Sequence, residues 1–218
     1  MKKSIGIAVL ILTLNSFQAL AINFMEGVHY DVIDDRVIEL AEHPVITEYF
    51  SFFCPGCRSL ENILPEIKSG LPTGMTFKKV HVDFIPGVAD ELQQLLTGAY
   101  ALSIIEGRDD HLVSTIFSHI HDKKLGIKSI NDIISLLVES GIGQTIAANK
   151  LISEDVATVV NKMNTEQLNL SINGYLKTVP TLMVNNKYVI LLSGLDRNDP
   201  LTQLNELIAY LNLKEGVQ

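Results

Sequence analysis

The sequence has no surplus of basic residues and, beyond its first residues, no long apolar run. Its 25 acidic side chains outnumber 17 lysines and arginines, which leaves a formal net charge of −8. A nucleic-acid-binding surface is basic, so this balance argues against a nucleic-acid partner. No later segment approaches the ~20 apolar residues that a membrane-spanning helix needs. We therefore expect a soluble protein with one domain of ordinary size, or one domain that carries an insertion.

The N-terminus has the three parts of a secretory signal peptide. Lys2 and Lys3 give a positive start, Ile5–Leu14 is mostly apolar, and Ala19-Leu20-Ala21 places small residues at a cleavage site. The alternative, a membrane anchor, requires a longer apolar stretch. We expect residues 1–21 to be removed by cleavage after Ala21, and the mature protein to be exported to an oxidising compartment such as the periplasm.

Cysteine is nearly absent, and the two that occur lie three positions apart, at Cys54 and Cys57. Exported proteins usually carry structural disulfides or no cysteine. A disulfide that closes so short a loop removes little entropy from the unfolded chain, so it would stabilise the fold only slightly. A zinc site needs two further ligands, but no other cysteine exists, and His119 and His121 would point to different sides of a helix. We predict a redox-active pair with no metal and no cofactor.

The segments around the pair predict a strand, a helix and a second strand. Val45–Phe53 is rich in β-branched and aromatic residues, and Thr76–Phe84 is similar. Between them, residues 55–68 place apolar side chains at helical spacing, and Pro65 is expected to kink or break this helix. Elements in this order form a right-handed crossover between parallel strands.

From Pro86 to Leu170 the pattern changes to helices, which we expect at residues 88–102, 112–121, 130–139 and 154–170. Ser129 and Asp132 resemble a capping box. Two apolar runs then flank Asn185-Asn186, and because asparagine tolerates the left-handed conformation of tight turns, they predict a β-hairpin. A final helix is expected over residues 201–213.

The position of Cys54 has a chemical consequence. At the N-terminus of a helix, unpaired amides and the macrodipole stabilise a thiolate. Pro55 fits the first helical position because its missing N–H is not needed there. Cys57, one turn later, can attack a mixed disulfide formed by Cys54. A low pKa also makes Cys54 a good leaving group, so the enzyme would readily give its disulfide away.

Three separated segments resemble the DsbA family of periplasmic disulfide oxidases: Glu48–Cys57, Lys79–Phe84 and Thr178–Tyr188. The resemblance covers essentially the whole mature chain. It implies an α/β protein with a thioredoxin fold interrupted by an inserted helical domain. The two parts of the thioredoxin-like domain would be residues 22–83 and 166–218, and the insertion residues 84–165. The resemblance also implies reduced exported proteins as substrates and reoxidation by a quinone-linked membrane partner of the DsbB type.

Glu48 shares a strand face with apolar residues. It is therefore either exposed at an edge or buried, and a buried carboxylate is costly unless it is paired or protonated. The resemblance places Glu48, with Lys79, beneath the active site near Cys57. It implies that Glu48 takes the proton that Cys57 must lose before it attacks.

Two further positions follow from the resemblance. By itself, Val179-Pro180 is typical of a trans bond at a strand start; the resemblance instead implies a cis bond that directs the backbone of Val179 at a substrate peptide. Gly56 departs from the family's best-known members, which have histidine there. We therefore expect Cys54 to have a pKa below that of a free thiol but above theirs. His81 fits a packed histidine as well as a functional one.

Two other functions remain open. A reductase or isomerase would use the same chemistry, but dimeric periplasmic isomerases carry an N-terminal dimerisation domain, for which the segment before Cys54 is too short. A redox-independent peptide-binding chaperone would need neither cysteine. We therefore expect a monomer that donates the Cys54–Cys57 disulfide.

Overall fold

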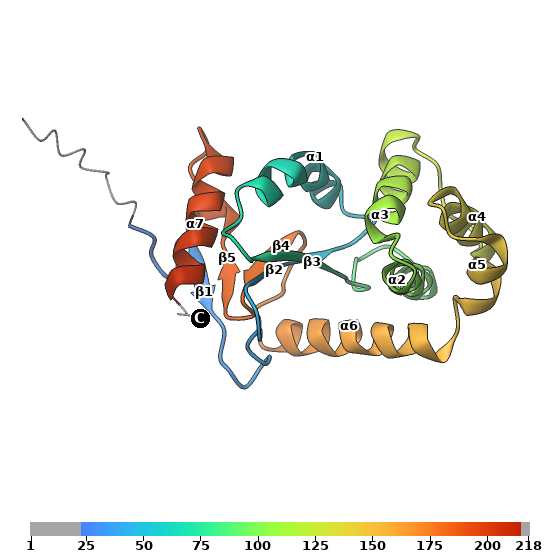
Figure 1. Cartoon of the computed structure of the whole chain (residues 1–218), viewed down its shortest axis with the longest axis horizontal. Helices are drawn as coiled ribbons and strands as arrows, with labels where there is room; N and C mark the ends of the chain where they lie inside the picture. The colour runs from blue at the N-terminus through green and yellow to red at the C-terminus, as the bar shows by residue number, and fades with distance from the viewer. Residues whose placement is uncertain (1–22, 215–218) are drawn as a thin grey trace, which may run out of the picture.

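A computed structural model describes residues 23–214. The expected signal peptide and its cleavage site after Ala21 lie outside these residues. The described chain forms a five-stranded sheet with helices on both faces and at one end (Figure 1). No helix between residues 23 and 214 is long and apolar enough to cross a membrane.

The sheet has the strand order β1-β5-β4-β2-β3. Its strands are β1 (Tyr30–Val32), β2 (Val45–Phe50), β3 (Thr76–His81), β4 (Thr181–Val184) and β5 (Tyr188–Ile190). β2 and β3 are parallel, and the other pairs are antiparallel. The predicted parallel pair and hairpin are thus confirmed, and Asn185 and Asn186 have the left-handed φ values of 53° and 55°. β1 was not expected, because three residues are too few to establish a period.

Two helices cover one face of the sheet. α1 (Pro55–Ser69) follows β2 directly, and α7 (Pro200–Lys214) packs beside it. Their apolar side chains share a core with the sheet that includes Ile46, Leu60 and Leu207. Pro65 was expected to kink or break the helix; α1 runs unbroken past it, so the helix is not broken there. The proline lies on an exposed face, and its missing amide costs the helix a single hydrogen bond.

A helical insertion separates β3 from β4. It comprises α2 (Asp90–Ile105), α3 (Asp109–Phe117), the π-helix η1 (Ser118–Asp122), α4 (Ile130–Glu139), α5 (Gln144–Lys150) and α6 (Glu154–Ile172). The capping box of Ser129 and Asp132 at the start of α4 is confirmed. The short α5, with one buried side chain, was not expected. The domain borders stay predictions, and the one between residues 165 and 166 falls inside α6. A 3-10 turn, η2 (Leu192–Gly194), precedes α7.

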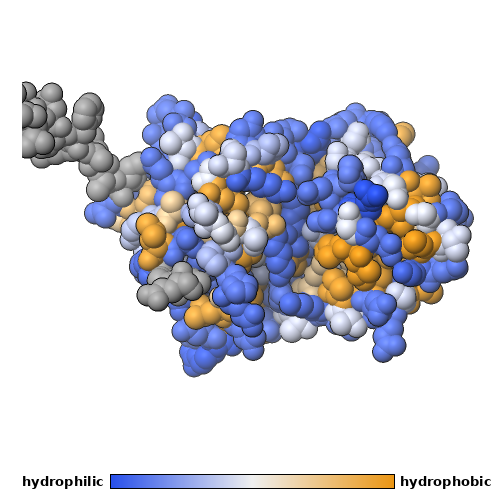
Figure 2. All heavy atoms as spheres, viewed as in Figure 1, coloured by the Kyte–Doolittle hydropathy of each residue, from blue (hydrophilic) through white to orange (hydrophobic). Residues whose placement is uncertain are grey.

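Figure 1 shows α2–α5 stacked at one end of the sheet, and α6 running back along its second face. A groove between α2 and α6 is lined by apolar side chains that include Leu95, Ile152 and Val160; Figure 2 shows such side chains gathered on this surface.

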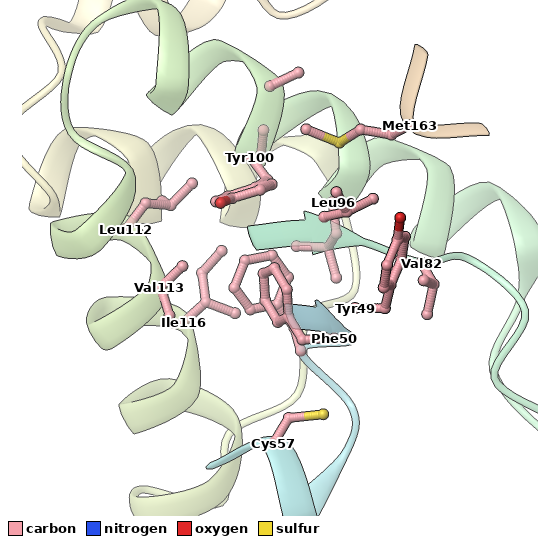
Figure 3. Packing of buried hydrophobic residues seen from close by; sticks show 14 of the residues in the cluster. Tyr49, Phe50, Cys57, Val82, Leu96, Tyr100, Leu112, Val113, Ile116 and Met163 are labelled. Carbon is pink, nitrogen blue, oxygen red and sulfur yellow. The ribbon is translucent and has the colours of Figure 1, made fainter. Parts of the chain in front are cut away.

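The larger core joins the sheet to the insertion. Phe50 packs edge-to-face against Phe52 and Tyr100, and Phe52 packs against Phe117 of α3. Such aromatic contacts add about 0.5–1.5 kcal/mol each beyond the area that they bury. Cys57 belongs to this cluster, and Figure 3 shows it at the base of the cluster, below Phe50. The start of α1 is therefore anchored to both parts of the molecule.

Candidate active site

The Cys54–Cys57 pair begins α1. Residues 51–54 form a turn in which the Cys54 amide donates to the Ser51 carbonyl at 3.1 Å. Cys54 is the N-cap of the helix, with extended backbone angles, and Pro55 lies in the first turn. The Cys57 amide donates to Cys54 Sγ at 3.2 Å. The sulfur therefore occupies the place of the oxygen that usually caps a helix.

The two thiols are free and differ in their surroundings. Cys54 is 9% exposed, whereas Cys57 is fully buried. A hydrogen bond from the Cys57 thiol, assisted by the amides of Cys57 and Gly56, lowers the pKa of Cys54 to about 6, although burial opposes this shift. Burial raises the pKa of Cys57 well above its usual range, and the neighbouring Cys54 raises it further. At neutral pH the first sulfur is a thiolate and the second a thiol.

The Val179-Pro180 loop lies against Cys54, whose thiol can donate to the Val179 carbonyl. The bond between the two residues is cis, and Val179 O lies 3.2 Å from Cys54 Sγ. Gly56 faces the same loop, since a Cβ added there would lie 3.2 Å from Pro180 Cδ and 3.7 Å from Cys54 Sγ. The predicted cis bond and its place beside the cysteines are thus confirmed.

A buried charged cluster lies on the adjoining strands. Glu48 on β2 and Lys79 on β3 are register partners; their side chains are 1% and 5% exposed, and Glu48 Oε2 lies 2.9 Å from Lys79 Nζ. Glu48 is therefore buried, not exposed at an edge. Lys79 also pairs with Glu61 of α1, which the sequence analysis missed. The one signal for Glu61 was its position a helical turn after Cys57.

The carboxyl group of Glu48 is poised to titrate near neutral pH. Burial raises its pKa to about 7, although Lys79 acts in the opposite direction. Burial also disfavours the charge of Lys79, but Glu48 and Glu61 outweigh it and raise the pKa of the lysine. Neither oxygen of Glu48 accepts a well-aligned hydrogen bond from the described residues. Glu48 also raises the pKa of Cys57, which places the two groups within electrostatic reach.

His81 is a packed histidine. It is fully buried, and burial lowers its pKa to about 3, so the ring is neutral. Its Nε2 accepts from the Phe52 amide at 3.4 Å, and its Nδ1 lies 2.8 Å from Thr97 Oγ1. Because the Thr97 hydroxyl donates to the Gln93 carbonyl, the network assigns the ring proton to Nδ1. His81 therefore supports the turn that leads to Cys54.

Two residues of η1 also reach this region and were not predicted. His121 Nε2 lies 2.8 Å from Phe52 O, and Asp122 forms an ion pair with Arg58, the residue after Cys57. No local pattern could reveal these contacts, since 69 and 64 positions separate the partners.

Comparisons with known proteins agree with this geometry. The family model of the DSBA-like thioredoxin domain matches residues 45–206. The thiol:disulfide interchange protein DsbA of Escherichia coli K12 is 29% identical over 206 residues, which are 92% of this chain and 94% of that protein. DsbA of Dickeya dadantii is 31% identical over 184 residues, 83% of each chain.

Solved structures are similar in fold. A Proteus mirabilis DsbA with a non-covalently bound peptide has a TM-score of 0.74 at 21% identity, and the match covers 88% of this chain and 100% of that one. A DsbA from Klebsiella pneumoniae has a TM-score of 0.73 at 23% identity, with 88% and 99% covered. The predicted fold class is therefore confirmed: a thioredoxin fold with an inserted helical domain.

Proposed function

Since the chain belongs to the DSBA-like thioredoxin-domain family and is a thiol–disulfide oxidoreductase, we propose that it donates its Cys54–Cys57 disulfide to reduced exported proteins. The observation that carries this proposal is the difference between the two thiols: the pKa of Cys54 is about 6, while that of Cys57 is raised. A stabilised thiolate is a good leaving group and favours the reduced enzyme, so the oxidised enzyme gives its disulfide away.

The transfer takes place in two exchanges. A substrate thiolate attacks Cys54 Sγ of the enzyme disulfide, the bond between the two enzyme sulfurs breaks, and Cys57 leaves. A second substrate thiolate then attacks the substrate sulfur of the mixed disulfide, and Cys54 leaves as a thiolate. The substrate gains a disulfide, and the enzyme pair takes up its two electrons.

Glu48 supplies the proton that this chemistry requires. Cys57 is buried, and its raised pKa means that it accepts a proton as it leaves; it gives this proton up again when the pair is reoxidised. A carboxyl group with a pKa of about 7 can serve both directions. Lys79 holds that carboxyl group through an ion pair at 2.9 Å.

The Val179-Pro180 loop receives the substrate. Val179 O lies beside Cys54 Sγ, so a peptide backbone that pairs with Val179 brings its own cysteine to the reactive sulfur. A peptide is bound to the Proteus mirabilis DsbA that shares this fold. Pro55 and Gly56 complete the site, because neither presents a long side chain to the incoming peptide.

We propose that the protein acts as a monomer in the periplasm, to which a signal peptide cleaved after Ala21 directs it. It is reoxidised there by a quinone-linked membrane partner of the DsbB type, because each donation leaves Cys54 and Cys57 reduced.

A reconstituted assay tests the proposal. The oxidised protein is mixed with a reduced two-cysteine client, and the client disulfide and the enzyme thiols are quantified together. We expect one client disulfide for each enzyme pair that is reduced, and none with Cys54→Ser. A wild-type protein that reduces an oxidised client instead would indicate a reductase. Client protection from aggregation that survives Cys54→Ser, without disulfide transfer, would indicate a chaperone.

A further inference from the structure

In the turn of residues 51–54, which precedes α1, the central peptide group has hydrogen-bond partners for both its N–H and its carbonyl. This group joins Phe52 to Phe53, between the residues whose hydrogen bond closes the turn. Its N–H donates to Ser51 Oγ at 3.3 Å, and its carbonyl lies 2.8 Å from His121 Nε2. Because a carbonyl can only accept, His121 Nε2 carries the proton. His121 is the one partner of this peptide group that comes from the helical insertion.

The next residue of η1 holds the opposite side of the cysteine pair. Asp122 accepts from Arg58 through both carboxylate oxygens, at 3.2 and 2.9 Å. Arg58 follows Cys57, and its amide donates to the Cys54 carbonyl at 3.1 Å. Two consecutive residues of a π-helix, a conformation common at functional sites, therefore hold the chain just before Cys54 and just after Cys57.

The two contacts differ in strength. Arg58 and Asp122 are both partly exposed, and such ion pairs contribute little. Phe52 is fully buried and His121 half-buried against the Phe117 ring, so removal of the imidazole leaves the Phe52 carbonyl without its donor. The hydrogen bond of His121 is therefore the stronger constraint on the turn.

We propose that His121 is a positioning residue for thiol–disulfide exchange, which fixes the turn before α1 and thereby holds Cys54 Sγ against the helix amides that stabilise its thiolate. When this turn relaxes, Sγ moves away from the Cys57 amide, the thiolate is less stable and the enzyme is a weaker oxidant. The inference concerns exchange at Cys54 itself and holds whichever direction of transfer the cell uses.

Three variants test this role in the full mature protein. His121→Leu removes the donor at similar volume, His121→Gln retains an N–H that can reach the carbonyl, and His119→Leu is the matched control. His119 Nε2 lies 3.4 Å from Gly126 O, and both residues belong to the insertion. Thiolate absorbance gives the pKa of Cys54, and equilibration with glutathione gives the redox constant.

We expect His121→Leu to raise the pKa of Cys54 by about half a unit to one unit. At pH 7 the same loss should weaken oxidation of glutathione by about three- to fivefold, because the raised pKa approaches the pH and less of the thiolate is formed. His121→Gln and His119→Leu should both stay near wild type. If His121→Leu lowers the free energy of unfolding but leaves both readouts unchanged, the residue is merely structural and the proposal is wrong. Equal shifts in His121→Leu and His119→Leu would also overturn it.

A measurement on the unmodified protein keeps the proposal open to refutation if a variant does not fold. Nitrogen-15 NMR of the imidazoles shows which ring nitrogens carry a proton. We expect His121 to carry its proton on Nε2, with a signal that differs between the oxidised and reduced forms. An Nε2 without a proton, or a signal that is identical in the oxidised and reduced forms, would overturn the proposal.

Discussion

Histidine in place of Gly56 should make the protein a stronger oxidant. The added Cβ would lie 3.7 Å from Cys54 Sγ, which brings an imidazolium within a few ångströms of the thiolate. At such distances, opposite charges near a protein surface attract by about 1–4 kcal/mol. We take the lower part of this range, about 1.4 kcal/mol, which corresponds to one pKa unit.

The effect on the redox equilibrium follows from this shift. The pKa of Cys54 is about 6, and we expect about 5 in the variant. At pH 7 the extra stabilisation of the reduced enzyme is then about 1.3 kcal/mol, because the thiolate is already mostly formed. This energy corresponds to about a ninefold change in the equilibrium with glutathione, or about 28 mV.

The assay combines thiolate absorbance titration with a glutathione redox equilibrium. Gly56→Ala is the matched control, because it presents the same Cβ 3.2 Å from Pro180 Cδ without the imidazole. If Gly56→His gives the same pKa as Gly56→Ala, or a higher one, the thiolate is controlled by other groups and the reasoning is refuted.

Three further outcomes are expected. Alkylation of the reduced protein should follow a midpoint near pH 6, the pKa of Cys54; labelling of Cys57 before Cys54 would contradict the assignment. Cys57→Ala cannot form the enzyme disulfide and should therefore donate none, and a mixed disulfide that its Cys54 forms with an oxidised client should persist on a non-reducing gel because no Cys57 thiol is present to attack it. Disulfide donation by this variant would contradict the proposed mechanism. Glu48→Gln should gain stability over wild type as pH rises from about 4.5 to about 7, by at most about 3 kcal/mol, because the folded protein holds a proton that the unfolded chain releases. Denaturant unfolding at several pH values measures this difference, and a pH-independent difference would mean that Glu48 stays ionised in the fold.

Local chemistry explains why much of the site could be predicted. Cys54 and Pro55 identify the start of a helix because the backbone N–H groups of the first turn have no partner within the helix. A cap side chain can accept from one of them, and proline has no N–H to leave unpaired. This reasoning requires no tertiary information. The alternation of side chains along β2 placed Glu48 on an apolar face. The cis bond at Pro180 came from the resemblance, since a lone Val-Pro pair is ordinarily trans.

Contacts between distant segments could not be predicted in this way. Glu61 lies on α1, and polar residues of a surface helix usually face water. Lys79 reaches Glu61 because β3 pairs with β2 beneath this helix, which the sequence around Glu61 does not reveal. His121 reaches Phe52 because the insertion folds back onto the start of α1. A helical period describes the helix that contains a residue, but it does not identify the partner on another element.

The redox state of Cys54 and Cys57 in living cells tests the proposed function most directly. Cells are quenched in acid, free thiols are modified with a reagent that adds mass, and the two forms are separated by gel mobility. Because a donor must be kept oxidised between transfers, the account predicts that the pair is mostly a disulfide. A pair that is mostly reduced in otherwise normal cells would contradict it and indicate a reductase.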